Sequence, residues 1–250
     1  MKVLGIIPAR FGASRFPGKL LADLEGMTVL ERVYRAAERA RELEGLWVAT
    51  ADEEIVRAVK AFGGRVLMTS TRPGSGTERL AEAARDLSAD GLINIQGDEP
   101  LLDPRLIDQV AVRLREEEEA VAITLKKAIS DPAEAADPNT VKVVTDRSGF
   151  ALYFSRSPIP HPGTRAAYKH IGLYGYRRDF LLKFARLPAG PLEKEERLEQ
   201  LRILENGYKI KVLETAEETI GIDTPEDLER ARRFIRRNDN DRNHKHQAQL

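Results

Sequence analysis

Short apolar runs alternate with amphipathic stretches along the first half of the chain, and this alternation is the feature that most constrains the fold. Apolar runs lie at 3–7, 46–50, 65–68 and 91–95, and stretches with helical periodicity follow them at 28–42, 53–62, 77–87 and 104–118. Continuous apolar strands joined by helices form a mostly parallel sheet covered on both faces, with ligands at the carboxyl ends of the strands. The sequence therefore predicts an α/β fold, and the residues that follow each apolar run are the first candidates for a functional site.

The second half of the chain departs from this rhythm, because aliphatic and aromatic residues alternate in two of its apolar segments. Alternation over 151–154 and 171–176 is typical of antiparallel strands. We also expect strands at 121–125, 141–144 and 209–214 and helices at 192–205 and 225–236. Thr224 and Pro225 supply an N-cap and a first-turn proline for the last helix. The sheet is therefore predicted to be mixed, and the proline-rich loop at 158–164 is the candidate boundary of a subdomain.

The composition excludes several classes of protein. Lys and Arg number 40 and so do Asp and Glu, which gives a net charge of zero. Such a chain does not bind nucleic acid or an anionic membrane through bulk charge. The absence of cysteine excludes disulfides, thiolate zinc sites and a cysteine nucleophile. The first apolar run ends at Pro8 and is too short for a signal peptide or a membrane span, so we expect a cytoplasmic protein.

The composition changes near the end of the chain. We expect one folded domain over 1–237, because residues 238–250 are rich in Asn, Asp, His and Gln and carry little apolar surface. Such a segment cannot offset the entropy of ordering, which predicts a disordered tail. His244 and His246 lie in this tail, and without an ordered scaffold they are weak candidates for a metal site.

A cationic loop with two glycines follows the first predicted strand. Its polar residues are Arg10, Ser14, Arg15 and Lys19. Glycine permits close approach of the backbone, hydroxyl and amide groups donate hydrogen bonds, and the cations can neutralise a triphosphate. The loop matches neither G-x-x-x-x-G-K-[ST] nor G-x-G-x-x-G, so the Walker and dinucleotide interpretations lose their main support. Solvated surface cations are the alternative, but the position after the first strand of an α/β sheet favours a phosphate site.

Carboxylates follow two other predicted strands. Asp98 and Glu99 come after the fourth apolar run, and Asp223 immediately precedes the last helix. Magnesium at nucleotide sites is commonly held by one or two carboxylates together with substrate phosphates, so Asp98 is a candidate ligand. The alternative is helix capping. Asp98 or Glu99 could cap the next helix, although Asp103 is better placed, and Asp223 could be only a neighbour of an N-cap.

Two further polar sets are candidates for the remainder of a substrate. The loop at 72–79 opens a helix, so its amides could hold a base or ribose; alternatively, Ser75 or Thr77 merely caps that helix. A second set suits a polyhydroxylated acid, with Arg for the carboxylate and the others for hydroxyls. Its members are Ser155, Arg156, Lys169, His170, Tyr174, Glu199 and Gln200. For His170, which adjoins an apolar strand, a purely structural role is the alternative.

Several sequence blocks, taken in order over residues 3 to about 235, resemble a known family. The most specific are Gln-Gly-Asp-Glu-Pro at 96–100, Tyr-Phe-Ser-Arg at 153–156 and Leu-Glu-Gln-Leu-Arg at 198–202, and the others lie at 8–10 with 14–19, 75–79, 170–176 and 221–228. Together they resemble the 3-deoxy-manno-octulosonate cytidylyltransferases. The three most specific blocks separate this family from the wider class of sugar nucleotidyltransferases.

The resemblance implies a fold, a reaction and an assembly. The fold is a Rossmann-like, three-layer nucleotide-diphospho-sugar transferase fold, with a small antiparallel part for sugar binding and dimerisation at about 150–205. The reaction transfers CMP from CTP to the anomeric hydroxyl of 3-deoxy-D-manno-octulosonate (Kdo) and releases pyrophosphate, as the activation step of lipopolysaccharide synthesis. The expected assembly is a homodimer.

By the same resemblance, each part of the site takes its own residues. Asp98 and Asp223 would bind Mg²⁺ and, with Arg10 and Lys19, serve catalysis. The nucleotide would contact Pro8, Ala9, Arg10, Ser14, Arg15, Lys19, Ser75, Gly76, Thr77 and Asp98. Kdo would contact Gln96, Arg156, His170, Tyr174, Glu199 and Gln200, although the last two could instead serve packing or the dimer.

Three rival functions stay open on the sequence alone. The same chemistry could act on another acid sugar, such as a sialic acid, or with another nucleotide. The chain could be a catalytically silent sugar-nucleotide sensor, which the retention of the predicted catalytic residues disfavours. An NAD-dependent oxidoreductase is disfavoured by the missing glycine fingerprint.

Overall fold

The structure, a computed structural model, describes residues 1–12, 15–72, 74–162 and 167–247, with side chains through residue 237. The predicted contact of Ser14 with the nucleotide therefore lies outside the described residues. The strands are β1 (Val3–Pro8), β2 (Asp23–Leu24), β3 (Met27–Thr28), β4 (Leu46–Thr50), β5 (Val66–Met68), β6 (Gly91–Asn94), β7 (Ala122–Ala128), β8 (Lys142–Thr145), β9 (Ala151–Ser155), β10 (Tyr168–Arg177) and β11 (Ile210–Glu214). The helices are α1 (Val29–Ala37), α2 (Glu53–Ala61), α3 (Gly76–Ala83), α4 (Pro104–Glu116), α5 (Pro132–Ala136), α6 (Arg178–Phe184), α7 (Pro191–Glu196), α8 (Leu201–Glu205) and α9 (Pro225–Gln247), with a 3-10 helix, η1 (Lys19–Leu21).

The apolar runs form a central sheet whose main path is β11-β7-β10-β6-β1-β4-β5. β1 pairs in parallel with β4 and with β6, β4 pairs in parallel with β5, and β7 pairs in parallel with β11. β10 is antiparallel to both of its neighbours, β6 and β7. Beside this path, β8 pairs antiparallel with β9 and with β10. The predictions of a mixed, mostly parallel sheet and of a smaller antiparallel part are confirmed.

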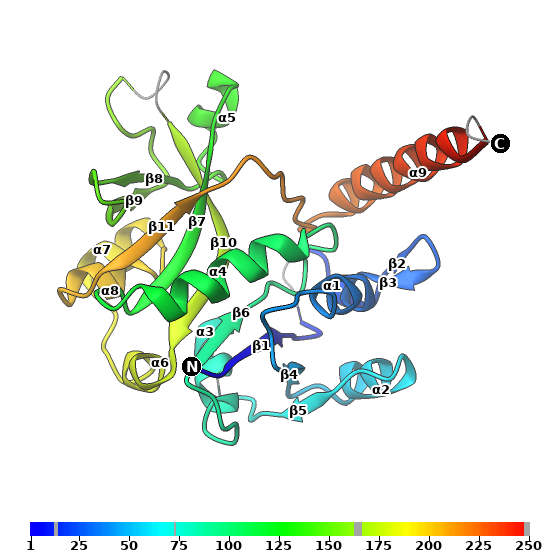
Figure 1. Cartoon of the computed structure of the whole chain (residues 1–250), viewed down its shortest axis with the longest axis horizontal. Coiled ribbons are helices and arrows are strands. Elements are labelled where there is room, and N and C mark those ends of the chain that lie inside the picture. Colours follow the sequence, from blue (N-terminus) through cyan, green and yellow to red (C-terminus); the bar gives the residue numbers. More distant parts are fainter. Residues whose placement is uncertain (13–14, 73, 163–166, 248–250) are drawn as a thin grey trace.

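Helices cover both faces of this sheet, as Figure 1 shows. Apolar side chains of α1, α2, α4 and the first turns of α9 share one core cluster with the sheet, and those of α3, α6 and α8 share another. α4 shows how local sequence determines where a helix begins and which of its faces is buried. The Asp103 side chain caps its first turn by accepting from the Arg105 backbone N–H at 2.8 Å, and Pro104 follows the cap. The residue spacing that predicted the helix, for example Leu106, Val110 and Leu114, is the face buried against the sheet.

The prediction of one helix over 192–205 is wrong. The segment forms two short helices, α7 and α8, because Arg197 has φ 54° and ends α7 in a left-handed turn. Leu192 is consequently exposed, whereas Leu201 is buried. A bidentate pair between the Arg202 guanidinium and the Glu193 carboxylate joins the two helices. The expected helix over 28–42 is also shorter than predicted, since α1 ends at Ala37.

Several short elements of the structure were not predicted from the sequence. These are the β2–β3 hairpin, η1, α5 and α6. α5 begins like α4, with an acidic cap at Asp131 followed by Pro132. Such short elements have little hydrophobic periodicity, so a pattern search over longer windows passes over them.

The last helix begins as predicted and ends later than predicted. Thr224 Oγ1 accepts from the Asp227 backbone N–H at 3.2 Å, and an Asp227 carboxylate oxygen accepts from the Thr224 backbone N–H at 3.0 Å, as in a capping box. α9 then continues through Gln247 and projects from the body of the protein (Figure 1). No glycine or proline follows Pro225 to stop it. The predicted disorder of 238–250 and the domain limits stay predictions.

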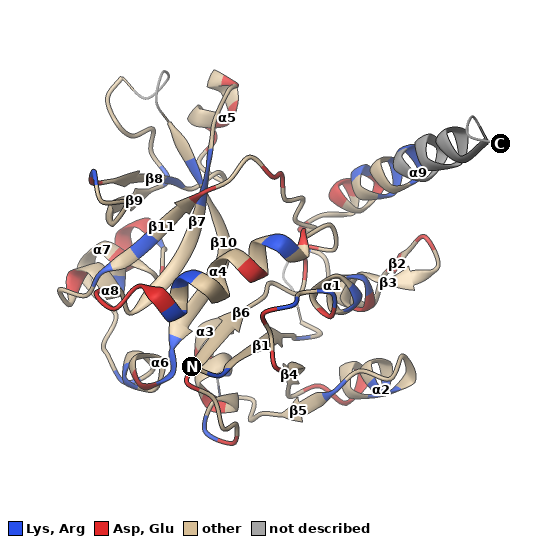
Figure 2. Cartoon of the chain, in the orientation of Figure 1, with Lys and Arg blue, Asp and Glu red and all other residues tan. Residues whose placement is uncertain are grey.

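Charge is distributed over the molecule without one dominant sign. Figure 2 shows acidic and basic residues interspersed along α1, α4 and the described part of α9. Among the described residues, no helix is long and apolar enough to cross a membrane. Charged side chains do cluster locally at the carboxyl ends of β1 and β6.

Candidate active site

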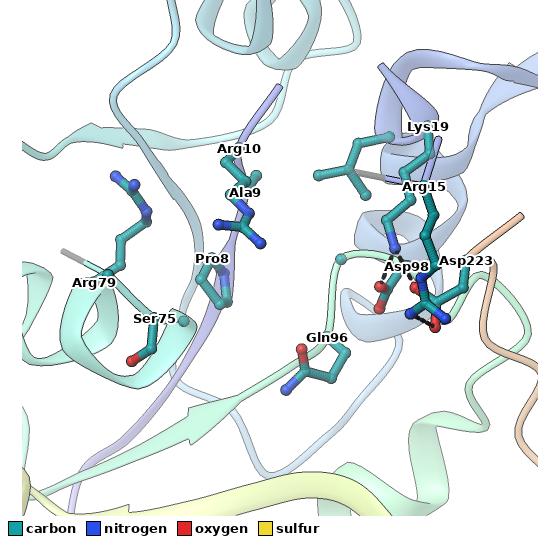
Figure 3. A pocket seen from close by; sticks show the side chains of 14 residues that line it. Pro8, Ala9, Arg10, Arg15, Lys19, Ser75, Arg79, Gln96, Asp98 and Asp223 are labelled. Carbon is teal, nitrogen blue, oxygen red and sulfur yellow. Dashed lines mark hydrogen bonds and ion pairs between the residues drawn. The ribbon is translucent and has the colours of Figure 1, made fainter. Parts of the chain in front are cut away.

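The predicted nucleotide residues meet at a cavity of about 250 Å³ beside the ends of β1 and β6 (Figure 3). The parallel pairing of these strands brings their carboxyl ends to the same edge of the sheet. The predicted residues that line the cavity are Pro8, Ala9, Arg10, Arg15, Lys19, Ser75, Gly76, Gln96, Asp98 and Asp223. The cavity thus unites residues from four separate parts of the sequence, of which strand direction brings together the two that follow β1 and β6.

Gly97 lines this cavity, and Gly18 lies next to Lys19, which also lines it. Gly18 has φ 72°, a left-handed conformation that costs glycine little, and it introduces η1 and Lys19. Gly97 follows β6, where a Cβ atom would lie 3.3 Å from the Pro8 carbonyl oxygen. Glycine at 97 therefore lets the ends of β1 and β6 approach closely.

Lys19 lies between the two predicted metal-binding carboxylates. Its ammonium donates to Asp98 Oδ2 at 2.6 Å, to Asp223 Oδ1 at 2.9 Å and to the Ile222 carbonyl oxygen at 2.8 Å. Burial alone would lower the pKa of Lys19, but the charges and hydrogen bonds of Asp98 and Asp223 outweigh burial and raise it. Asp98 and Asp223 consequently share one cation, and the capping alternative for Asp98 is not what the structure shows.

Arg15 extends the same cluster toward solvent. Its guanidinium contacts Asp223 Oδ2 at 2.8 Å, and both side chains are about half exposed. Arg10 follows β1 and lies across the cavity from Lys19 (Figure 3). Cations thus lie on two sides of a space into which the carboxylates of Asp98 and Asp223 also point, which suits a phosphate chain accompanied by a metal ion.

On the opposite side of the cavity, Ser75 has two roles. Its hydroxyl oxygen accepts from the Glu78 backbone N–H at 3.1 Å, which caps α3, and its hydroxyl donates to Glu199 Oε1 at 2.8 Å. Burial raises the pKa of Glu199 above its usual value. The capping interpretation of Ser75 is therefore correct, and the same residue also links the predicted nucleotide loop to a predicted Kdo residue.

Six of the described predicted contacts lie away from the cavity lining: Thr77, Arg156, His170, Tyr174, Glu199 and Gln200. Thr77 is buried in the first turn of α3. Glu199 and Gln200 lie between α7 and α8, and the Gln200 side chain makes no capping bond to α8. Glu199 accepts a hydrogen bond from Ser75, which links α3 to the segment between α7 and α8. Its predicted contact with Kdo stays a prediction.

Polar groups of β6 and β10 lie next to the cavity. Gln96 lines it and donates through Nε2 to the Gly172 carbonyl oxygen at 3.3 Å. Tyr174 pairs across the strands with Asn94, and both are buried. The Tyr174 hydroxyl comes near Thr124 without hydrogen-bond geometry, and neither it nor Asn94 Oδ1 has a partner among the described residues. Two buried polar atoms beside the cavity thus lack a hydrogen-bond partner among the described residues.

His170 is not among the residues that line the cavity. Its ring lies against Phe154, with centroids 5.1 Å apart, and against Tyr174, at 5.2 Å. Its Nε2 lies 3.0 Å from Thr124 Oγ1. Although the residue keeps some accessible surface, burial of the ring lowers the pKa of His170 to about 3. The imidazole is therefore neutral near pH 7 and does not offer a positive charge to a substrate carboxylate.

Arg156 is held more firmly than the sequence suggested. Its Nε donates to the Glu196 carbonyl oxygen at 2.9 Å and one terminal nitrogen donates to the Pro138 carbonyl oxygen at 3.0 Å. The Glu196 carboxylate also accepts from the Arg156 backbone N–H at 2.8 Å and from the Ser155 hydroxyl at 2.6 Å. Much of the Tyr-Phe-Ser-Arg block therefore anchors the end of α7.

Three residues that support the site, Arg79, Lys142 and Glu196, were given no role from the sequence, and Glu99 was considered only as a helix cap. Arg79 is buried, lines the cavity and donates to the Ser70 carbonyl oxygen and to Thr69, which ties α3 to the loop after β5. Burial, assisted by the charge of Asp98, raises the pKa of Glu99 to about 8. The Lys142 ammonium donates to three carbonyl oxygens, including that of Arg156 at 2.5 Å. Glu196 and Lys142 carried no sequence signal, because their partners are brought to them only by the packing of the strands.

Comparison with known proteins agrees with this geometry. Residues 4–211 match a family model described as cytidylyltransferase. The chain is 54% identical over 239 residues to 3-deoxy-manno-octulosonate cytidylyltransferase of Solibacter usitatus, covering 94% of this chain and 95% of the relative. It is 49% identical over 244 residues to the enzyme of the same name from Geobacter sulfurreducens, covering 92% of this chain and 98% of the relative.

Solved structures show the same fold. A structure of CMP:2-keto-3-deoxy-manno-octonic acid synthetase complexed with CTP has a TM-score of 0.91 and 42% identity, covering 95% of this chain and all of that one. A 4-diphosphocytidyl-2C-methyl-D-erythritol synthase from Anaerococcus prevotii has a TM-score of 0.61 at 16% identity, over 94% of this chain and 97% of that one, and so shows the fold alone. The three-layer nucleotidyltransferase fold is thereby confirmed. With its strand-end carboxylates, its cationic loop and these relatives, the chain belongs to the 3-deoxy-manno-octulosonate cytidylyltransferase family.

Proposed function

We propose that the chain transfers CMP from CTP to Kdo. The anomeric hydroxyl of Kdo attacks the α-phosphorus of CTP, the bond from this phosphorus to the oxygen that bridges to the β-phosphate breaks, and pyrophosphate leaves. The observation that carries the proposal is the cluster of Lys19, Asp98 and Asp223 at the edge of a cavity lined on its other side by Ser75. Relatives of high identity over nearly the whole chain support the choice of both substrates.

The donor set suits Mg²⁺. Asp98 and Asp223 already converge on one cation, the Lys19 ammonium, which stands in for a metal ion. Among the described residues, no three acidic, histidine or cysteine side chains are grouped so that they could hold a metal ion, so phosphate oxygens and water would complete the coordination. Bound there, Mg²⁺ would neutralise charge on the triphosphate.

The residues of the chain itself have separate tasks in this scheme. Arg10, Arg15 and Lys19 bind the triphosphate and stabilise the negative charge that develops on pyrophosphate as it leaves. The backbone of Ser75 and Gly76, at the start of α3, faces the nucleotide. Holding both substrates in line contributes much of the rate, since phosphoryl-type transfer needs no covalent nucleophile from the protein.

We place Kdo beside Gln96 and Tyr174, over the region of the two unpartnered buried oxygens. The guanidinium of Arg156 has more N–H donors than its two bonds to carbonyl oxygens use, so it can also bind the Kdo carboxylate. His170, Glu199 and Gln200 complete this side of the proposed site. His170 contributes as a neutral hydrogen-bonding group.

We also propose a homodimer, formed by the second half of the chain. Within the described residues β9 itself pairs only with β8, although Phe150, just before it, forms one bridge with Lys211 of β11; Leu152 on β9 is 62% exposed. An unpaired strand edge with an exposed leucine is suited to association with a second copy. Light scattering coupled to size-exclusion chromatography tests the proposed dimer. We also propose a cytoplasmic location.

Pyrophosphate release is the direct test of the function. The assay contains CTP, Kdo and Mg²⁺, and each is omitted in turn. We expect release only with all three, with UTP and a sialic acid as poor replacements. CTP binding without pyrophosphate release would instead support a silent sensor, and turnover of a sialic acid in preference to Kdo would change the assigned sugar.

A further inference from the structure

One buried hydroxyl group on β7 contacts three polar atoms of β10. Thr124 is fully buried. Its Oγ1 lies 3.0 Å from His170 Nε2, 3.0 Å from the Ile171 carbonyl oxygen and 2.9 Å from the Leu173 carbonyl oxygen. A hydroxyl group in contact with three partners within a sheet calls for an explanation beyond packing.

The register of the two strands explains the two carbonyl contacts. Ile171 pairs with Leu125 and Gly175 pairs with Ile123, so a step of four residues on β10 faces a step of two on β7. β10 therefore bulges between these pairs, and carbonyl groups within the bulge cannot all reach the ladder of β7. The Thr124 hydroxyl lies where it can donate to the carbonyl oxygen of Leu173, which belongs to the bulge, or to that of Ile171, which flanks it.

The same contacts determine which nitrogen of His170 carries the proton. A hydroxyl group has one hydrogen, and carbonyl oxygens only accept. If the Thr124 hydroxyl donates this hydrogen to a carbonyl oxygen of β10, Oγ1 can only accept a hydrogen bond from His170. Nε2 must then carry a hydrogen and donate it to Oγ1. Nδ1 of a neutral imidazole is then an acceptor. Burial lowers the pKa of His170 to about 3, in agreement with a neutral ring.

The ring cannot easily turn to exchange its nitrogens. Phe154 packs edge-on against it, with an interplanar angle of 83°, and Tyr174 packs against it at 52°. Tyr174 stacks in turn on Tyr176, with centroids 5.4 Å apart. The orientation of the imidazole is therefore set by the aromatic contacts and its tautomer by Thr124.

We propose that Thr124 is a positioning residue for the acid-sugar site: it fixes His170 as the tautomer protonated at Nε2, so that Nδ1 accepts a hydrogen bond from a Kdo hydroxyl. This inference rests on the proposed function, because it takes His170 to contact Kdo. It assigns His170 to a hydroxyl of the sugar and leaves the carboxylate to arginine. Thr124 itself contacts no substrate.

The test combines ring-nitrogen NMR with kinetics of three variants. Thr124→Val removes the hydroxyl at nearly constant shape, Thr124→Ser keeps it, and Thr145→Val is the matched control. Thr145 is also a threonine of the sheet, on β8, where its Oγ1 accepts from Lys126 Nζ at 2.8 Å and makes no hydrogen bond to His170. The ¹⁵N shifts of His170 report the tautomer whether or not the protein is active.

We expect wild-type His170 to show a protonated Nε2 and an unprotonated Nδ1. Thr124→Val should mix the tautomers and raise KM for Kdo on the order of tenfold, the effect of one neutral hydrogen bond, with KM for CTP unchanged. Thr124→Ser and Thr145→Val should keep the wild-type spectrum and KM. His170→Asn, whose amide can replace Nδ1, should retain more Kdo affinity than His170→Gln, whose amide replaces Nε2.

Two results would overturn the inference. A wild-type His170 protonated at Nδ1 would remove the assigned role of Thr124. A changed tautomer in Thr124→Val with an unchanged KM for Kdo would show that His170 does not serve the sugar. Failure of the proposed function is recognised separately. The wild type would then release no pyrophosphate from CTP and Kdo, while the ¹⁵N spectrum would still report the tautomer of His170.

Discussion

Replacing Lys19 by methionine should make the free protein a better metal binder. In the structure the Lys19 ammonium occupies the space between Asp98 and Asp223, so a divalent cation must displace it. The Lys19 side chain is 12% exposed and the two carboxylates are 30% and 49% exposed. Lys19→Met keeps much of the apolar stem but removes the competing charge.

The size of the effect follows from the bonds that the ammonium gives up. Hydrogen bonds to charged groups contribute about 1.5–3 kcal/mol each, and partial exposure reduces this. For two carboxylates and one carbonyl oxygen we take a displacement cost of about 2–4 kcal/mol in total. At about 1.4 kcal/mol per tenfold change, Lys19→Met should bind Mn²⁺ about 30- to 700-fold more tightly than the wild type.

Electron paramagnetic resonance of free Mn²⁺, titrated without CTP, measures this affinity. Lys60→Met on the exposed face of α2 is the control and should behave as the wild type. Adding Asp98→Asn to Lys19→Met should abolish the gain. An unchanged or weaker affinity in Lys19→Met would refute the idea that the ammonium holds the place of the metal. Turnover should nevertheless be lost in Lys19→Met, since the same ammonium is needed by the triphosphate.

Three further predictions concern the carboxylate, the buried lysine and the histidine. Asp98→Asn should abolish pyrophosphate release while circular dichroism shows a folded protein; near-normal turnover would contradict the metal assignment. Lys142→Met should lower the free energy of unfolding by about 2–4 kcal/mol. Three carbonyl oxygens lose a charged donor, and removing the buried charge recovers only part of the stability lost with these hydrogen bonds. Calorimetry should show a Tm lower by roughly 5–15 °C. A Tm equal to that of Lys60→Met would show that the hydrogen bonds of Lys142 do not stabilise the fold. Finally, burial lowers the folded-state pKa of His170 to about 3 against an ordinary 6.5, so the unfolded chain takes up a proton that the folded chain refuses. Stability from this group is complete above pH 6.5 and is lost as pH falls toward 3. Between pH 7 and 5, the free energy of unfolding measured in urea should therefore fall by about 2 kcal/mol less in His170→Gln than in the wild type; parallel losses would contradict burial of the ring.

The predicted fold depended on signals that neighbouring residues generate. Apolar runs, helical periodicity and caps such as Asp103 with Pro104 are local, and each of these was visible in the sequence and confirmed. The interrupted helix at Arg197 was not visible, because its left-handed turn is maintained by packing of α7 on α8 through the Arg202–Glu193 pair. Where a tertiary contact overrides local preference, sequence periodicity misleads.

The candidate site divides in the same way. The sequence by itself determined which residue types follow each strand, and the parallel pairing of β1 with β6 brings Arg10 and Asp98 to one edge of the sheet. Only the tertiary structure decided that Lys19 lies between carboxylates 79 and 204 positions away, and that Ser75 reaches Glu199 124 positions away. It alone placed Thr124 beneath the bulge of β10. The physical reason is that hydrogen bonds and ion pairs depend on distances of a few ångströms, which packing of the whole chain sets and no local pattern encodes.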